Sequence, residues 1–274
     1  MKFNHFLKAV VGSLFAISSF ASNAHDIYIW PSFFSVDTDK SKSVTVDITA
    51  SHTTFRPDFS MPSSGVKAYG VDGKQIRRVG SFYQGAQRST FDLAVEAQGT
   101  YGLIYERGPS YFSRYTVGKR ETEKRLRASK SEAQAKMPKN GKNLETSKYF
   151  TVAMSYLTNG APTDAVLQPK NKGFELVPVT HPADYVTGEE IQIKALFNGE
   201  PAKDLDFTLE KEGPQYQEEP LVVDLKSDSE GLVNFSLEEG GRFMLKVYHK
   251  MKSEDAEADF DITRVYYAFE VIYE

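Results

Sequence analysis

Residues 44–51 alternate between apolar and polar side chains, with the apolar positions all on one parity. A period of two over this length predicts a β-strand with one buried face. The run at residues 25–34 is apolar and aromatic on both parities, which predicts a strand covered on both faces. A polar turn at residues 36–42 separates the two runs. We therefore expect an antiparallel hairpin that brings His25 close to His52.

The rest of the N-terminal half shows shorter strand patterns and one segment of a different kind. Strands are predicted at Val66–Val71, Phe91–Ala94, Tyr101–Arg107 and Tyr149–Leu157. The segment Lys119–Lys142 is rich in Lys, Arg, Glu and Ala, and it holds few apolar residues. We expect this charged segment to form a solvated helix or a mobile insertion, because it offers little to a core.

Strand patterns become regular after a turn-rich linker between Asn159 and Gly173. The predicted strands are Phe174–Thr180, Glu190–Phe197, Asp206–Lys211, Leu221–Lys226, Leu232–Leu237, Arg242–His249 and Thr263–Tyr273. Short strands with turns at this spacing are typical of an immunoglobulin-like sandwich. The sequence thus predicts an all-β protein with two β-sandwich domains. The first covers residues 25–165 and carries the charged insertion 119–142, and the immunoglobulin-like second covers residues 173–274.

The first 24 residues have the pattern of a secretory signal peptide. Lysines begin the stretch, an apolar run follows at residues 9–20, and Ser22 and Ala24 satisfy the small-residue rule for cleavage. The apolar run is too short to span a bilayer as a helix. A rival cut after Ala21 also satisfies the rule, but the cut after Ala24 lies directly before the strand-like run. We expect a periplasmic protein without a membrane span, whose mature chain begins at His25.

The amino-acid composition limits which covalent cross-links, metal sites and binding partners the protein can have. The chain has no cysteine, which excludes disulfides, thiolate metal sites and a lipidated N-terminal cysteine. Loss of Lys2 and Lys8 with the signal peptide would move the formal net charge from −4 to about −6. A net charge of this sign favours neither nucleic acid nor an anionic membrane as a partner.

A mature N-terminus at His25 would carry distinctive donor chemistry. The free α-amine and the ring Nδ1 of an N-terminal histidine can close on one metal ion, and the ring of His52 would add a third nitrogen. Amine and imidazole donors suit Cu(II), Ni(II), Co(II) or Zn(II). Asp26 or Asp58 would supply an oxygen ligand or an acceptor that orients a ligand. His249 is a further candidate ligand if the C-terminal domain folds back onto this end.

The histidines also have a purely structural interpretation. His52 lies on the inward parity of its strand, so a buried, hydrogen-bonded side chain is an alternative to a metal ligand. His181 and His249 are expected to be polar residues satisfied by hydrogen bonds within a sandwich.

No catalytic signature stands out, so we expect that the protein is not an enzyme. The nucleophile motif Gly-x-Ser-x-Gly and the zinc motif His-Glu-x-x-His are both absent from the sequence. A histidine brace is also the copper site of oxidative polysaccharide-cleaving enzymes, which makes a copper oxidase one alternative. Another alternative is a structural or ligand-binding sandwich protein without metal, in which Tyr111, Phe112 and Tyr115 would grip a sugar or a partner.

Several segments resemble, in the same order, a domain-of-unknown-function family of secreted bacterial proteins once described as nickel uptake transporter (NikM-like) components. The distinctive segments are the two with histidines, His25–Ser32 and Ser51–Pro57. The others are Phe174–Thr180, Phe197–Ala202, Ser227–Phe235, Tyr248–His249 and Tyr267–Val271.

The resemblance implies a periplasmic protein associated with transition-metal uptake. Together with the donor set, it leads us to expect that the protein binds nickel, cobalt or copper in connection with that uptake. It also implies a membrane metal transporter or an outer-membrane receptor as partner, and a C-terminal immunoglobulin-like or carboxypeptidase-regulatory-like domain. One position departs from the family pattern: His181 stands where a small polar residue is expected, so no role is carried over to it.

Overall fold

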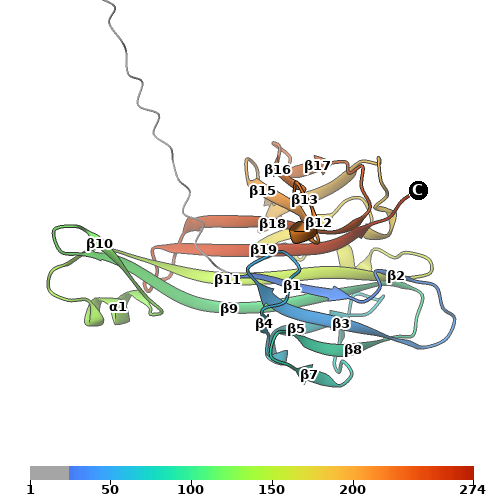
Figure 1. The fold of residues 1–274 in the computed structure, drawn as a ribbon, viewed down its shortest axis with the longest axis horizontal. Helices are drawn as coiled ribbons and strands as arrows, with labels where there is room; N and C mark the ends of the chain where they lie inside the picture. Colours follow the sequence, from blue (N-terminus) through green and yellow to red (C-terminus); the bar gives the residue numbers. More distant parts are fainter. Residues whose placement is uncertain (1–24) are drawn as a thin grey trace, which may run out of the picture.

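Three β-sheets make up most of residues 25–274, the part of the chain that the computed structural model describes (Figure 1). The predicted signal peptide and its cleavage site lie outside the described residues. The all-β expectation is confirmed: strands dominate, and the single α-helix among the described residues is α1, Lys130–Lys136. No helix in this range is long and apolar enough to cross a membrane.

The first sheet, called here the N-terminal sheet, holds the predicted hairpin. Its strands, in spatial order, are β1 (Asp26–Pro31), β3 (Lys42–Ser51), β8 (Ser89–Val95) and β7 (Phe82–Gln84), with β4 (Phe59–Ser60) paired to β3. The C-terminal sheet holds β12 (Phe174–Pro178), β13 (Ile191–Phe197), β14 (Glu200–Pro201) and β17 (Leu232–Phe235).

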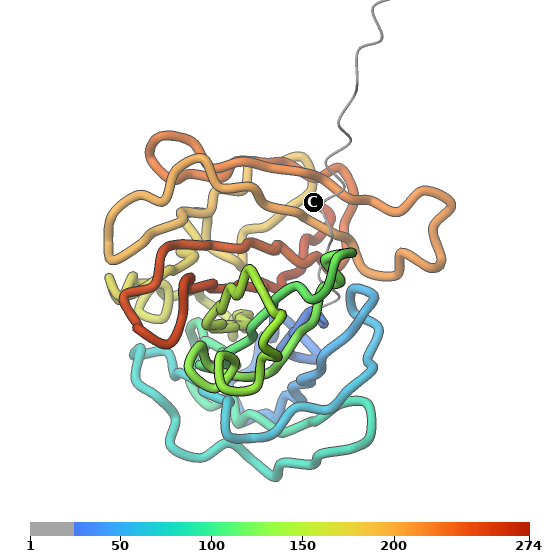
Figure 2. Tube along the Cα trace, turned by 90° about the vertical axis from the view of Figure 1, so that its left-hand side faces the viewer, coloured from blue at the N-terminus to red at the C-terminus, as the bar shows by residue number. Residues whose placement is uncertain are grey.

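The central sheet runs between these two and takes strands from both halves of the chain. Its order is β16 (Val222–Lys226), β15 (Asp206–Lys211), β18 (Gly241–Lys252), β19 (Phe260–Val271), β11 (Gly141–Asn159), β9 (Gly99–Val117), β5 (Val66–Tyr69) and β6 (Gln75–Ile76). Two short strands lie off this path: β10 (Thr122–Leu126) pairs with β9, and β2 (Ser35–Val36) pairs with β11. In Figure 2 the N-terminal residues, in blue and cyan, lie below the central strands and the orange C-terminal residues above them.

Alternating side chains of the central sheet enter two different cores, because successive residues of a strand point to opposite faces. From β18 and β19, Met244 and Tyr266 pack with the N-terminal sheet. Their neighbours Leu245 and Tyr267 pack with the C-terminal sheet. Each outer sheet is therefore one half of a sandwich whose other half is the central sheet.

The strands after Gly173 form an immunoglobulin-like sandwich. Every strand predicted for this half is found, with bounds that shift by a few residues. Seven longer strands follow Gly173, and they are counted here in chain order. One sheet contains the first, second and fifth of them (β12, β13, β17). The other contains, in spatial order, the fourth, third, sixth and seventh (β16, β15, β18, β19). This Greek-key order is that of the immunoglobulin-like folds, with the fourth strand on the second sheet.

The expected division into two separate domains needs a correction. Strands β11 and β19 pair in parallel, with Ser147–Met154 opposite Phe260–Tyr267, so one sheet continues from the first half into the second. The linker at residues 160–173 separates two cores and not two sheets. The sequence pattern located the strands, but it carries no information on which strand pairs with which across such a distance.

Strands β9 and β11 are each 19 residues long and extend past the N-terminal sheet as an arm (Figure 1, left). We define the arm as residues 110–149 and its tip as residues 118–142. The charged insertion forms this tip, and it is part strand and part helix. Strand β10 pairs with β9, and α1 begins with a capping box formed by Ser129 and Glu132.

Candidate metal site

The first hairpin places His25 beside His52, as predicted. In the register of β1 and β3, Asp26 lies opposite Ser51, so the next residue outward on each strand is a histidine. The centroids of the two imidazole rings are 3.9 Å apart, with an angle of 60° between the ring planes. Phe59 closes one side, its ring centroid 4.7 Å from that of His25.

Asp58 holds the ring of His52 by one nitrogen. The Nδ1 atom of His52 lies 3.1 Å from Oδ2 of Asp58, and the backbone N–H of His52 donates to the same oxygen at 2.8 Å. This backbone hydrogen bond is the main cause that lowers the pKa of Asp58. The carboxylate therefore occupies Nδ1 of His52 and leaves Nε2 for another partner. The side chain of His52 is 55% exposed, so that nitrogen is within reach of solvent species.

The ring of His25 has an unused nitrogen. Its Nε2 atom is buried and has no hydrogen-bond partner. Burial is the main cause that lowers the pKa of His25, and the neighbouring His52 lowers it further. A neutral imidazole with a free nitrogen is the form that binds metals. Buried ring nitrogens without a partner are uncommon. The chelate with the α-amine would use the other ring nitrogen, Nδ1, so the unpartnered Nε2 is not itself the proposed metal donor.

The loop that carries His52 is anchored from below by two residues. Phe55 is buried and stacks on Trp30, with ring centroids 4.4 Å apart and 15° between the planes. Its φ angle of 61° lies in the left-handed region, which an aromatic residue rarely adopts. Next to it, the buried Thr54 contacts Glu210 and Lys246 of the central sheet. Together these contacts hold the loop in a strained conformation, as is common at functional sites.

Asp26 does not join the histidines. Its carboxylate is only 13% exposed and pairs with the ammonium group of Lys246, which also contacts Glu210 at 2.8 Å. Burial raises the pKa of Asp26 in spite of the lysine. Burial works to lower the pKa of Lys246, but the two carboxylates outweigh it and raise that pKa. Asp26 is thus removed from the expected ligand set: as the strand neighbour of His25 it points to the other face.

His249 is also removed from that set. It lies between Phe174 and Phe197, and each ring centroid is 4.9 Å from that of the histidine. Its parity on β18 is that of Leu245, so it faces the C-terminal sheet. The C-terminal half does fold against the N-terminal half, but it presents Lys246 to that side. Burial lowers the pKa of His249, consistent with a neutral core residue.

His181 is a satisfied polar residue, as expected. Its Nε2 atom lies 3.0 Å from the hydroxyl of Thr100, and its Nδ1 atom accepts the backbone N–H of Ala183 at 3.0 Å. Both ring nitrogens are therefore occupied, which makes His181 a suitable control position.

Side chains alone supply two metal donors at this site. Within residues 25–274 no group of three or more histidine, cysteine, aspartate or glutamate side chains has a geometry that could hold a metal ion. A third donor must come from the backbone or from outside the described residues. The α-amine of a chain that begins at His25 would provide it within the same residue.

The aromatic residues expected to grip a ligand have different roles. Tyr111 donates its hydroxyl to Asp255 at 2.7 Å, and Tyr115 is buried in the arm. Phe112 is 45% exposed and packs edge-on against Tyr149. They do not form one shared surface.

Sequence analysis missed the anchors Lys246, Thr54 and Phe55. Their role follows from their proximity to Asp26 and Trp30 in the folded chain, and no local pattern marks it for Thr54 or Phe55. The parity of Lys246, a lysine at an inward strand position, was the single available signal.

Comparison with solved structures gives distant likenesses. The adhesin InvE of Yersinia pseudotuberculosis is 13% identical, with 89% of this chain and 58% of that chain covered, at a TM-score of 0.23. The D0-D1 domain of intimin is 10% identical, with 90% and 98% covered, at a TM-score of 0.21. This chain thus spans less than two thirds of the InvE chain. No curated protein matches the sequence. The family model described as a domain of unknown function (DUF4198) matches residues 22–251, and the chain therefore belongs to this family.

Proposed function

We propose that this protein binds one divalent transition metal ion through His25 and His52, as a periplasmic carrier in metal uptake. The observation that carries the proposal is the pair of imidazole rings 3.9 Å apart, with one ring held by Asp58. A carboxylate that fixes one nitrogen of a histidine while the other binds metal is the usual support of such sites.

The donor chemistry favours late first-row metals. Two imidazoles and an amine are nitrogen donors, which suit nickel, cobalt and copper, and affinity alone favours copper. Three nitrogens leave coordination positions open. A carrier needs such open positions to hand its metal to the next protein, here a membrane metal transporter or an outer-membrane receptor.

Two lines of support connect the site to uptake. The segments around both histidines resemble those of secreted proteins once described as nickel uptake transporter components. The expected signal peptide would export the chain and create the amine at His25. Binding requires deprotonated donors, so the affinity for metal falls as the pH drops below neutral.

The test begins with mature protein purified from the periplasm. Its mass should correspond to a chain that starts at His25, and it should bind one equivalent of Ni(II), Co(II) or Cu(II) in calorimetry. His52→Ala should lower the affinity by more than the roughly 10- to 100-fold that loss of a supporting partner costs. His181→Ala is the control and should leave binding unchanged.

A one-alanine extension before His25 keeps every side chain and moves the amine away. If the extended protein binds as tightly as the parent, the amine is not a ligand. If His52→Ala binds as tightly as the parent, the site itself is wrong. A copper oxidase would use the same nitrogens, and oxidised product from a polysaccharide with reductant and oxygen would favour that alternative.

A further inference from the structure

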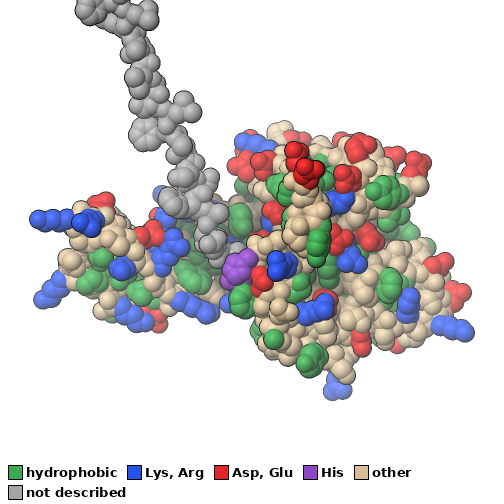
Figure 3. Space-filling model, viewed as in Figure 1, with side chains coloured by type: hydrophobic (Ala, Val, Ile, Leu, Met, Phe, Trp, Pro, Cys, Tyr) green, Lys and Arg blue, Asp and Glu red, His purple; other side chains and the backbone are tan. Residues whose placement is uncertain are grey.

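Charge is distributed very unevenly along this chain. The arm tip, residues 118–142, holds nine Lys and Arg against three Asp and Glu. Residues 173–274 hold nine Lys and Arg against 23 Asp and Glu. The formal net charge of −4 for the whole chain therefore conceals a basic tip and an acidic C-terminal half. Figure 3 shows Lys and Arg side chains on the protruding arm and a concentration of Asp and Glu on the opposite part of the molecule.

Most of the basic side chains at the tip are exposed and unpaired. On the β9–β10 hairpin these are Lys119, Arg120, Lys124 and Arg127. None of the four takes part in an ion pair within residues 25–274. Their neighbour Arg125 does pair with Glu123, at 2.7 Å.

The other side of the tip continues this pattern. Lys136, Lys139 and Lys142 are exposed and likewise lack an acidic partner among the described residues. Seven free positive charges thus surround the end of the arm.

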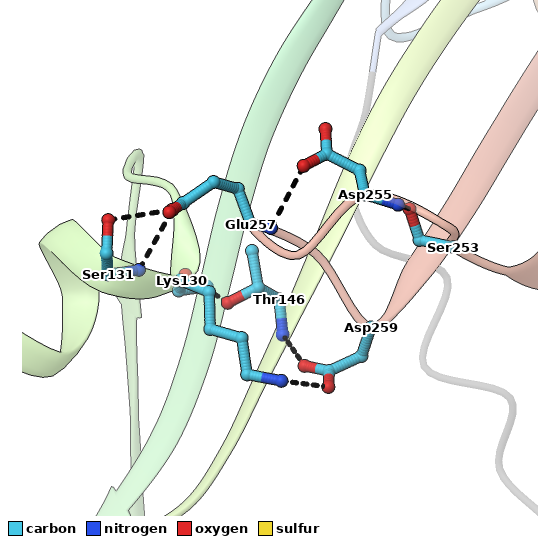
Figure 4. Close-up of polar contacts among 8 residues, drawn as sticks. Lys130, Ser131, Thr146, Ser253, Asp255, Glu257 and Asp259 are labelled. Atoms are coloured by element: carbon cyan, nitrogen blue, oxygen red, sulfur yellow. Dashed lines mark hydrogen bonds and ion pairs between the residues drawn. The ribbon is translucent and has the colours of Figure 1, made fainter.

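Contacts from the acidic loop at residues 253–259 brace the arm that carries these charges. Figure 4 shows that the acidic loop between β18 and β19, residues 253–259, contacts the first residues of α1. Asp259 accepts a hydrogen bond from Nζ of Lys130 at 2.5 Å and another from the backbone N–H of Thr146 at 2.8 Å. Glu257 accepts the backbone N–H and the hydroxyl of Ser131 at 3.0 and 2.7 Å. These acids are consumed in bracing the arm and do not neutralise the free lysines and arginines.

The end of the β9–β10 hairpin extends past the strands of the acidic half, and only the loop at residues 253–259 reaches the tip, at α1. Ser147 pairs with both Phe112 and Phe260, the first residue of β19, so Ser113–Val117 of β9 extend past the end of β19. Five strand residues span about 17 Å. The Debye length at physiological ionic strength is about 8 Å. A surface that touches the β9–β10 hairpin is therefore screened from the negative charges that lie beyond the loop at residues 253–259.

The tip lacks the apolar centre that a protein interface needs. Specific protein interfaces have a buried core enriched in aromatic residues. No large apolar side chain in residues 118–142 is exposed. Contact with lipid headgroups needs only charge, and each Lys or Arg near an anionic leaflet strengthens binding roughly fivefold.

We propose that the arm tip docks the protein on the anionic phospholipid headgroups of a bilayer. The proposal does not depend on the metal site. It applies to the tip alone and is compatible with a net negative charge, because the acids of the loop at residues 253–259 are paired and most other acids lie beyond the screening distance. The arm would hold the acidic half away from the membrane and fix the orientation of the molecule.

The test is cosedimentation of the mature protein with vesicles that contain phosphatidylglycerol, and with vesicles of phosphatidylcholine alone. The parent should bind the first and not the second, and binding should weaken as salt is added. The combined variant K119Q/R120Q/K124Q/R127Q should lose about a hundredfold or more in vesicle affinity, at roughly fivefold per charge. Its melting temperature should match the parent, since these side chains contribute nothing to a core.

The matched control removes four exposed, unpaired basic side chains elsewhere: K40Q/R77Q/R78Q/K203Q. It has the same net charge as the arm variant and should bind vesicles like the parent. Equal loss in both variants, or no vesicle binding by the parent, overturns the proposal. Sedimentation velocity of the parent alone at low salt tests the competing partner: self-association that the arm variant abolishes, without vesicle binding, would assign the tip to a second copy of the chain.

Discussion

Lys246 links the start of the chain to the central sheet at the level of single residues. It is buried and contacts Asp26, Glu210 and Thr54, which come from three separate segments. Two of these partners, Asp26 and Thr54, lie next to or near the two site histidines. The ammonium group thus fixes both sides of the candidate metal site without touching either ring.

Lys246→Met should destabilise the protein by about 3 kcal/mol, because removing one partner of a buried ion pair leaves its carboxylates uncompensated. The measurement is the free energy of unfolding in urea. Lys252→Met changes an exposed lysine on the same strand and should cost within about 0.5 kcal/mol. If Lys246→Met loses as little unfolding free energy as the control, the contacts of Lys246 with Asp26, Glu210 and Thr54 do not stabilise the fold.

Asp58→Asn should weaken metal binding by about 10- to 100-fold, because the amide no longer fixes the tautomer and orientation of His52. Calorimetric titration with Ni(II) or Cu(II) measures this, and thermal stability should change little because Asp58 lies at the surface. Asp37→Asn, at an exposed position without an ion pair in the described chain, is the control. Unchanged affinity in Asp58→Asn would place the metal elsewhere.

The proximity of His25 and His52 was accessible to sequence analysis, and the anchors were not. Strand parity and the polar turn fix the register of a hairpin, so the two ends follow from local pattern. The environment of Asp26 depends on a lysine 220 residues away, and no local pattern encodes that contact. Because the sequence pattern does not show this remote lysine, Asp26 was expected to be a metal ligand, whereas it pairs with the ammonium group of Lys246.

The arm is the element whose form departs most from its expected description. Few apolar residues predicted a solvated helix or a mobile insertion, and one helix is present. The remainder is ordered by contacts from the loop at residues 253–259, whose acids sit far along the sequence. Periodicity within a segment detects burial by its own side chains. It does not detect hydrogen bonds and ion pairs that another segment supplies.

Asp255 should make the arm sensitive to acid. The hydroxyl of Tyr111, with further hydrogen bonds from the Glu257 amide and Lys148, lowers the pKa of Asp255 from 3.8 to about 2. A lowered folded-state pKa stabilises the protein above the unfolded value, and the stabilisation disappears as the pH falls through the folded value. The contribution is therefore complete above pH 3.8 and lost toward pH 2.

Asp255→Asn should thus lower the urea midpoint near neutral pH, and its difference from the parent should shrink as the pH falls from about 4 toward 2. Glu254→Gln, at the exposed neighbouring position, should follow the parent at every pH. A pH-independent difference between Asp255→Asn and the parent would mean that the carboxylate is not the stabilising group.

The central sheet pairs strands from both halves of the molecule. The sequence pattern correctly gave the strands and the two-core arrangement of a sandwich protein. It suggested independence of the halves because the linker is rich in turn residues. The parallel pairing of β11 with β19 joins those halves, and it also places Met154 and Tyr156 of the first half in the core of the second.

Chemical denaturation should therefore show a single transition. Trp30, the one tryptophan in the chain, reports on the N-terminal sandwich, while far-ultraviolet circular dichroism reports on all strands. The two probes should give the same midpoint. A fragment of residues 173–274 should not unfold cooperatively, since it lacks the strand that covers β19. Separate midpoints, or a stable fragment, would restore the two-domain description.

If the chain is exported from its N-terminus, as proposed, the pairing of Asp26 with Lys246 also sets an order of events. The first strand emerges at once, but its anchor follows 220 residues later. Contacts this remote in sequence form late in folding, because a long loop must close first. The histidines are therefore held in their final geometry only when almost the entire polypeptide has emerged. Under the proposed function, metal capture by this geometry would therefore follow the completion of export and not precede it.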